Sequence, residues 1–226
     1  MLPDLRQFIE TVFVAVAALV PIVNPLGGAP IYLTKTVDLT SEQHDELALR
    51  VARNCAVLLL ASLLLGAYLL DFFGLSVPIV QVAGGLVVCS IAWSLLHDPD
   101  AAPPMQAEAR RVVSSEDLRR RAFYPLTMPL TVGPGSISVA ITLGSQRPRG
   151  FATYGDMALV GGAAIAGLLG IALTIYVCYR YADTVVAILG ERGTNVMVRL
   201  SAFILLCIGI QILWTGWSAL SATVGR

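Results

Sequence analysis

Long apolar stretches alternate with shorter polar ones along this chain of 226 residues. A stretch of about 20 apolar residues is as long as an α-helix needs to be to cross a bilayer. Six stretches have this character, at roughly 8–33, 51–70, 76–96, 124–145, 156–179 and 199–220. The pattern therefore predicts an all-α membrane protein with six transmembrane helices.

The composition agrees with this prediction. The chain is 56% hydrophobic and 13% charged, and its mean hydropathy is +0.76, whereas a soluble domain carries about 25% charged residues. The spans occupy most of the chain, so we expect a single transmembrane domain over 1–226. Its surroundings would be the lipid bilayer, and no nucleic-acid partner is expected.

Basic residues are unevenly distributed over the connections between the spans. Eleven Lys or Arg residues lie in or beside the first, third and fifth connections, and four lie on the opposite side. Because Lys and Arg concentrate in cytoplasmic loops, we expect these three connections in the cytoplasm and both termini outside. The Arg119–Arg121 cluster is then interpreted as a topology anchor.

A hydrophilic stretch at 97–121 divides the chain into two sets of three spans. The domain would comprise a first three-helix half (1–96), a cytoplasmic connection (97–123) and a second three-helix half (124–226). Because three is odd, the second half enters the membrane from the opposite face. Two such halves would form a 3+3 inverted repeat, which is a common plan among transporters.

Two ten-residue segments share a proline pattern. Residues 21–30 and 125–134 both read Pro-x3-Pro-Leu-x3-Pro and together hold six of the twelve prolines. Proline removes a backbone donor and clashes with the preceding helical turn, so we expect the first and fourth spans to be interrupted. The predicted helix-break residues are Pro21, Pro30, Pro125, Pro129 and Pro134.

The flanks of the two segments differ. An apolar run precedes the first segment, whereas the charged residues 110–121 precede the second. Either the two halves differ in detail, or residues 112–124 form an amphipathic counterpart of the first half-helix.

Interrupted helices in corresponding positions of two halves are typical of a transporter's substrate site. A broken helix presents free amides at one end and free carbonyls at the other, so it can bind a zwitterion without buried charged side chains. The candidate substrate-binding residues are Asn24, Pro25, Gly27, Gly28, Thr131, Gly133, Gly135 and Ser136. The alternative is that the prolines only kink packed helices. Gln81 and Gln211 are candidates for polar lining or for hydrogen bonds between helices.

These residues carry a family resemblance. The segment Asn24-Pro25-Leu26-Gly27 with Pro30, and the segment Pro129-Leu130 with Gly133-Pro134-Gly135, resemble the two signature segments of the MarC family of bacterial inner-membrane proteins. The resemblance extends over essentially the whole chain. SnatA-type members of the family transport small neutral amino acids such as glycine and alanine. The resemblance therefore implies amino acid movement across the bacterial inner membrane. Together with the two interrupted halves, it makes a secondary transporter of small neutral amino acids, working by alternating access, the leading hypothesis.

Other functions stay open at this point. A drug or metabolite exporter would favour a large aromatic-lined pocket, but aromatic residues make up only 8% of the chain. A non-transporting membrane scaffold is a further alternative. Enzyme activity is not expected, because His44 and His97 lie outside the spans, in solvated connections, and Asp71 has no evident catalytic partner.

Cofactors and partners are expected to be few. The four cysteines lie in or beside different spans without metal-ligand spacing, so we expect no metal and no resident cofactor. The coupling ion of a transporter would be a proton or sodium. The glycine-rich fifth span favours close helix packing, either within the protomer or in a homo-oligomer.

Overall fold

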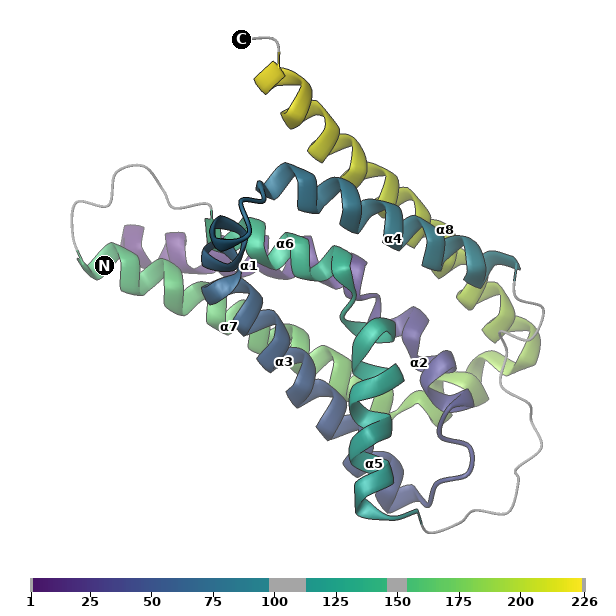
Figure 1. Cartoon of the computed structure of the whole chain (residues 1–226). Coiled ribbons are helices and arrows are strands. Elements are labelled where there is room, and N and C mark those ends of the chain that lie inside the picture. Colours follow the sequence, from purple (N-terminus) through teal and green to yellow (C-terminus); the bar gives the residue numbers. More distant parts are fainter. Residues whose placement is uncertain (1, 98–112, 146–153, 225–226) are drawn as a thin grey trace.

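The computed structural model describes residues 2–97, 113–145 and 154–224. All regular elements within these ranges are helices (Figure 1). In chain order they are α1 (Leu2–Val23), α2 (Pro25–Thr34), α3 (Ser41–Phe72), α4 (Val77–His97), α5 (Ser115–Arg121), η1 (Ala122–Thr131), α6 (Pro134–Ser145), α7 (Tyr154–Arg180) and α8 (Ala182–Val224). The prediction of an all-α protein is confirmed for this part of the chain.

Five helical segments in the described ranges are long and apolar enough to cross a membrane. They are Phe8–Leu33, Ser41–Phe72, Val77–His97, Gly161–Arg180 and Arg192–Ala222. The first comprises most of α1 and α2, on either side of a break. The predicted fourth span, 124–145, contains the short elements η1 and α6 instead of one long helix.

The outer surface of the bundle is apolar. Many large hydrophobic side chains are exposed, among them Phe13, Leu65, Trp93, Leu173, Phe203, Trp214 and Trp217. Soluble monomers rarely expose contiguous apolar patches larger than a few hundred Å², whereas hydrocarbon surrounds such side chains without cost. The exposed surface therefore agrees with a protein embedded in a bilayer.

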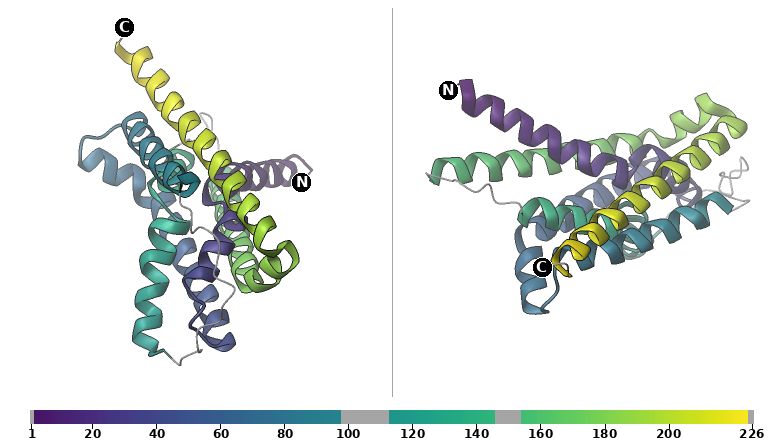
Figure 2. Two further views of the ribbon diagram at one scale, coloured as in Figure 1. Left: turned by 90° about the vertical axis from the view of Figure 1, so that its right-hand side faces the viewer. Right: turned by 90° about the horizontal axis from the view of Figure 1, so that it is seen from above.

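The long helices pack in pairs, and the short helices lie between the pairs. α4 and α8 run side by side (Figures 1 and 2), α3 packs against α7, and α1 packs against α7. The short helix α2 contacts α7 and α8, and the short helix α6 contacts α3 and α4. Each short helix thus bridges one member of the α3–α7 pair and one member of the α4–α8 pair.

α8 consists of two helical parts that meet at Gly190. This residue has φ 65° and ψ 178°, a region of backbone conformation that is essentially restricted to glycine. The chain therefore turns after a short first helical part and then enters the apolar span Arg192–Ala222.

Small residues bring the backbones of α4 and α8 together. A Cβ added to Gly85 would lie 2.7 Å from the backbone nitrogen of Leu213 and 2.8 Å from the carbonyl oxygen of Gly209. A Cβ added to Gly216 would lie 2.7 Å from the carbonyl oxygen of Pro78. Such close approach strengthens van der Waals packing where lipid removes most of the hydrophobic driving force between helices.

We expect Gly85→Ala to destabilise the protein, because its Cβ would press on backbone atoms of α8 that have little freedom to move. Overpacking of this kind costs about 1–3 kcal/mol, which lowers the midpoint of thermal unfolding by about 2 °C or more. The midpoint is measured on protein purified in detergent. Gly162→Ala is the matched control, since a Cβ there would meet nothing within 4 Å. Equal midpoints for Gly85→Ala and the wild type would contradict the packing argument.

Candidate functional site

The first helix break lies at Asn24, between α1 and α2. Asn24 has φ 46° and ψ 56°, the left-handed conformation that Asn adopts more readily than most residues. Its N–H donates to the Val20 carbonyl at 2.8 Å, and its carbonyl accepts from the Gly28 N–H at 2.9 Å. Its side-chain Oδ1 accepts from the Gly27 N–H at 3.2 Å. Asn24 therefore ends α1 and caps α2, and Pro25 occupies the first helical position, where proline is favoured.

The second interruption is spread over η1 and the residues that follow it. Tyr124 (φ −127°, ψ 124°) and Met128 (φ −124°, ψ 125°) leave helical geometry, and Val132 is extended (φ −114°, ψ 101°). Tyr124 and Met128 immediately precede Pro125 and Pro129, and the residue before a proline is pushed out of the helical region. The Tyr124–Pro125 peptide bond is cis.

Gly133 caps the helix that follows this second interruption. Its carbonyl accepts from the Ile137 N–H at 3.1 Å, and α6 begins at Pro134. The Gly133 N–H donates to the Ser136 hydroxyl at 3.1 Å. Here the side chain of the third helical residue, Ser136, accepts from the N–H of the capping residue. At the first break the roles are reversed, because the side chain of the capping residue, Asn24, accepts from the N–H of the third helical residue.

The structure corrects the register and the positions of the predicted breaks. The proline pattern aligns Pro30 with Pro134, but Pro25 and Pro134 are the residues that begin a helix after a break. Pro21 lies inside α1 and Pro30 inside α2, and neither interrupts its helix. Proline has a helical φ and costs an interior helix a hydrogen bond and some steric strain, and the surrounding packing here tolerates that cost.

Residues from both proline segments line one small cavity. Asn24, Gly27 and Gly28 contribute from the first segment and Leu130 from the second, while α4 and α8 supply much of the remaining wall, including Ser201. The cavity volume is about 30 Å³, which accommodates about two water molecules. It is far smaller than the pockets of about 300–1,000 Å³ that hold drug-sized ligands.

Tyr179, at the end of α7, joins the two segments beside this cavity. Its hydroxyl lies 2.7 Å from Thr131 Oγ1, and a Cβ added to Gly28 would lie 2.7 Å from the same hydroxyl. Its ring stacks on Tyr32 of α2, with centroids 4.6 Å apart and an interplanar angle of 15°. Both tyrosines are completely buried. Sequence reasoning missed Tyr179, because a tyrosine near the end of an apolar span belongs to no motif.

Of the other predicted residues, three lie at the second break and the two glutamines lie elsewhere. Thr131 and Ser136 are buried, and a Cβ added to Gly135 would lie 2.3 Å from Val88 Cγ2, so the start of α6 packs tightly on α4. Gln81 donates to Thr142 Oγ1 at 3.1 Å and so joins α4 to α6. Gln211 is exposed on α8. In the described ranges, no three His, Cys, Asp or Glu side chains are grouped as metal ligands.

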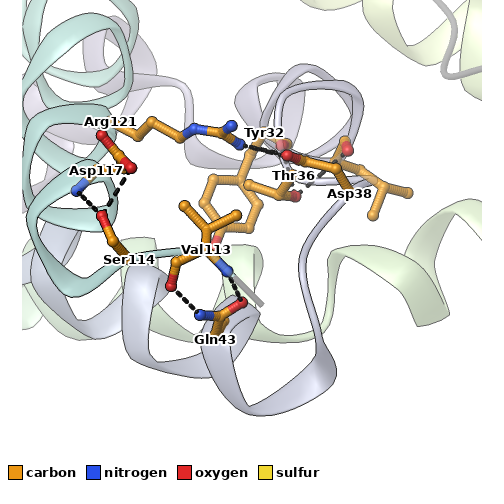
Figure 3. Close-up of polar contacts among 9 residues, drawn as sticks. Tyr32, Thr36, Asp38, Gln43, Val113, Ser114, Asp117 and Arg121 are labelled. Atoms are coloured by element: carbon orange, nitrogen blue, oxygen red, sulfur yellow. Dashed lines mark hydrogen bonds and ion pairs between the residues drawn. The ribbon is translucent and has the colours of Figure 1, made fainter. Parts of the chain in front are cut away.

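A polar cluster ties the connection after α2 and the first turn of α3 to the segment before η1 (Figure 3). Arg121 Nη1 lies 2.9 and 2.8 Å from the two carboxylate oxygens of Asp38. The Gln43 side chain donates to the Val113 carbonyl at 2.7 Å and accepts from its N–H at 3.2 Å. Arg121 therefore has a structural partner in addition to the anchoring role predicted for its cluster.

His44 is buried, which corrects the expectation of a solvated residue. Because α3 begins at Ser41, ahead of the predicted span at 51–70, His44 lies in its first turn. The His44 ring meets the Tyr32 ring edge-on at a centroid distance of 4.9 Å. The Tyr32 hydroxyl donates to the His44 carbonyl at 2.7 Å.

The helices and the two breaks define a multi-pass α-helical membrane protein with an interrupted segment in each half of its sequence. The chain belongs to the MarC family of integral membrane proteins, which it matches over residues 9–220. The resemblance found in the sequence is thus confirmed at the level of the family.

The relatives are similar over most of their length. The chain is 31% identical over 204 residues to a UPF0056 membrane protein of Buchnera aphidicola subsp. Schizaphis graminum, with 90% of this chain and 89% of the relative covered. It is 26% identical over 209 residues to the UPF0056 inner membrane protein MarC of Escherichia coli strain SMS-3-5 / SECEC, with 92% and 94% covered. No solved structure matches this chain. The family and the apolar helices identify a multi-pass protein of the inner membrane.

Two substitutions at Asn24 separate its backbone role from its side-chain role. Asn24→Ala removes the oxygen that caps α2, which costs about 1 kcal/mol, and it places alanine in a left-handed conformation that costs about 1–2 kcal/mol more. Asn24→Gly also loses the oxygen but adopts the conformation freely, so we expect a loss of only a few tenths of a kcal/mol. Thermal midpoints in detergent should therefore fall clearly for the Ala variant and little for the Gly variant. Equal midpoints for the two variants would show that the left-handed backbone at residue 24 is unimportant.

Proposed function

We propose that this protein is a secondary transporter that moves small neutral amino acids, of the glycine and alanine class, across the inner membrane by alternating access. The observation that carries the proposal is that the two interrupted segments meet. Asn24 and Leu130, from opposite halves of the sequence, line one cavity, and no charged side chain is among the described residues that line it.

The chemistry of the first break supports a zwitterionic substrate. The C-terminal end of α1, with its partial negative charge, meets the N-terminal end of α2, with its partial positive charge, at a single residue, Asn24. Such helix ends complement the carboxylate and the ammonium group of a zwitterion through their partial charges, although the Gly27 and Gly28 N–H groups are themselves paired with Asn24. Ser201 adds a hydroxyl to the same wall.

The small size of the site supports a small substrate. A Cβ added to Gly27 would lie 2.5 Å from both Asn24 Nδ2 and Ser201 Cβ, so the first turn of α2 is packed against α8 without spare volume. A cavity of about 30 Å³ has to expand to admit even glycine, and the expansion needed is far smaller than for a drug. These dimensions favour amino acid transport over drug export.

We infer that the two halves form a 3+3 inverted repeat with six spans, the fourth comprising η1 and α6. The pattern of helix contacts supports this arrangement, because the main contacts between the halves occur in matching pairs. α2 packs on α7 and α8 as α6 packs on α3 and α4, and α1 packs on α7 as η1 packs on α3. The corresponding long helices pair with each other, α3 with α7 and α4 with α8. In this arrangement, α5 and η1 take the place of α1.

The proposal includes no enzyme activity and no resident cofactor. A proton or a sodium ion is the candidate coupling ion, and the two are distinguished by imposing a gradient of each in the flux assay. Self-association is tested on the same preparation by measuring the mass of the protein in detergent.

Purified protein in liposomes should exchange radiolabelled alanine or glycine for internal unlabelled substrate. Asn24→Gly should lower the rate at sub-saturating alanine by about tenfold or more, because a hydrogen bond to a charged group contributes about 1.5–3 kcal/mol. The backbone of the variant is retained, so its thermal midpoint serves as a folding check. Gly162→Ala, at an open position, is the control with normal exchange.

Three outcomes would redirect this proposal. Normal exchange by Asn24→Gly would remove Asn24 from the site. Drug efflux without amino acid exchange would favour an exporter. Neither exchange nor thermal stabilisation of the wild type by any amino acid would favour a non-transporting scaffold.

We infer from the basic connections that both termini and Asp71 lie outside and that Glu116 lies in the cytoplasm. Asp71 and Glu116 are exposed, so a cysteine at either position should react with a maleimide that does not cross the inner membrane, provided that the position faces the reagent. After replacement of the native Cys55, Cys89, Cys178 and Cys207, Asp71→Cys should be labelled in cells whose outer membrane alone is permeable. Glu116→Cys should be labelled only after the inner membrane is opened. The reverse pattern would invert the topology.

A further inference from the structure

We propose that Tyr179 is a positioning residue that couples the two interrupted segments, so that the substrate cavity beside α2 and the break after η1 change shape together. This inference rests on the proposed transport function for its meaning, while its structural part can be tested without substrate. It is drawn from three observations on one completely buried side chain.

The first contact ties Tyr179 to the second interruption. The Thr131 hydroxyl donates to the Leu126 carbonyl at 2.7 Å, which uses its single proton. At the 2.7 Å distance between the Tyr179 hydroxyl and Thr131 Oγ1, the tyrosine is therefore the donor. Thr131 is the last residue of η1, and so this hydrogen bond lies directly before Val132, whose backbone is extended.

The second observation places the same hydroxyl against the first turn of α2. A Cβ at Gly28 would lie 2.7 Å from the Tyr179 hydroxyl but 3.4 and 3.5 Å from the nearest ring carbons. The hydroxyl group alone therefore occupies the space that a side chain at residue 28 would need. α2 cannot shift toward α7 unless Tyr179 moves, and Tyr179 cannot move without stretching its hydrogen bond to Thr131.

The third contact holds the ring in place. Tyr179 stacks on Tyr32 of α2, and Tyr32 is itself bonded to the His44 carbonyl at the start of α3. The neighbouring Arg180 lies 3.0 Å from Asp45, also in the first turns of α3. The Tyr179 ring is thus held through Tyr32 by α3, while its hydroxyl lies at both broken segments. A rigid element of this kind can transmit movement between sites.

The test is a rescue experiment on four proteins: the wild type, Gly28→Ala, Tyr179→Phe and the double variant. Gly28→Ala should lose alanine exchange by about tenfold or more, because overpacking displaces α2. In the double variant the hydroxyl is absent, and the remaining contacts at 3.4 Å and beyond are ordinary ones. Exchange by the double variant should therefore return to within about twofold of Tyr179→Phe alone.

A matched control checks that the rescue is specific. Gly27→Ala places its Cβ against Asn24 and Ser201 instead of Tyr179, so Tyr179→Phe should not rescue it. No rescue of Gly28→Ala, or equal rescue of Gly27→Ala, would overturn the assignment.

A double-variant cycle with Thr131→Val distinguishes coupling between the two segments from a purely structural role of Tyr179. If Tyr179 acts through Thr131, Tyr179→Phe and Thr131→Val should each lower the maximal exchange rate, leave the KM for alanine within about twofold, and have no larger effect together than singly. Additive effects on the rate, or no effect of Tyr179→Phe, would refute the coupling.

A readout without substrate separates this inference from the proposed function. Leu95 lines the cavity on α4, and Leu95→Cys, with the native cysteines replaced, reports on cavity opening through its rate of maleimide labelling. Gly28→Ala should change that rate, and Tyr179→Phe should restore it. If the wild type exchanges no amino acid but the labelling rate is restored, the proposed function fails and the coupling stands. If exchange is normal and the labelling rate is not restored, the coupling fails.

Discussion

A backbone that leaves helical geometry inside a membrane needs partners within the protein, because hydrocarbon offers none. Both breaks meet this requirement locally. At the first, the Asn24 side chain accepts the Gly27 N–H; at the second, the Ser136 hydroxyl accepts the Gly133 N–H. A complete capping box has both kinds of hydrogen bond at one helix N-terminus, whereas here each break has one of the two. The rest of the site depends on them, because they stabilise the ends of α2 and α6 without a bound ligand.

Short helices that are capped in this way still need close packing, and small residues provide it. Gly27 and Gly28 bring the first turn of α2 against Ser201 and Tyr179, and a Cβ at Gly84 would lie 3.1 Å from the Pro134 carbonyl oxygen at the start of α6. The starts of both short helices therefore lie against the α4–α8 pair, α6 on α4 and α2 on α8. Tyr179 adds a contact at the first break that also reaches Thr131, so the two halves contribute differently to the site.

Polar contacts at one end of the bundle maintain register between the halves. The Arg121–Asp38 and Arg180–Asp45 pairs are partly exposed, with between 28% and 41% of each side chain accessible. Ion pairs of this kind contribute about 0–1 kcal/mol each. Their effect lies in geometry rather than stability, because they hold the connection after α2 and the first turns of α3 against α5 and α7. The two hydrogen bonds between Gln43 and Val113 act at the same place.

The sequence by itself determined the protein class, the family and the two segments within which the helices are interrupted. Apolar stretches of this length are typical of membrane spans, and a proline disfavours helical geometry in the residue before it, as Tyr124 and Met128 show. The tertiary structure alone decided that Pro25 corresponds to Pro134, that Pro21 and Pro30 are tolerated inside helices, and that Tyr179 and His44 are buried beside α2. These outcomes depend on which distant helix supplies the contact, and no local pattern in the chain records that partner.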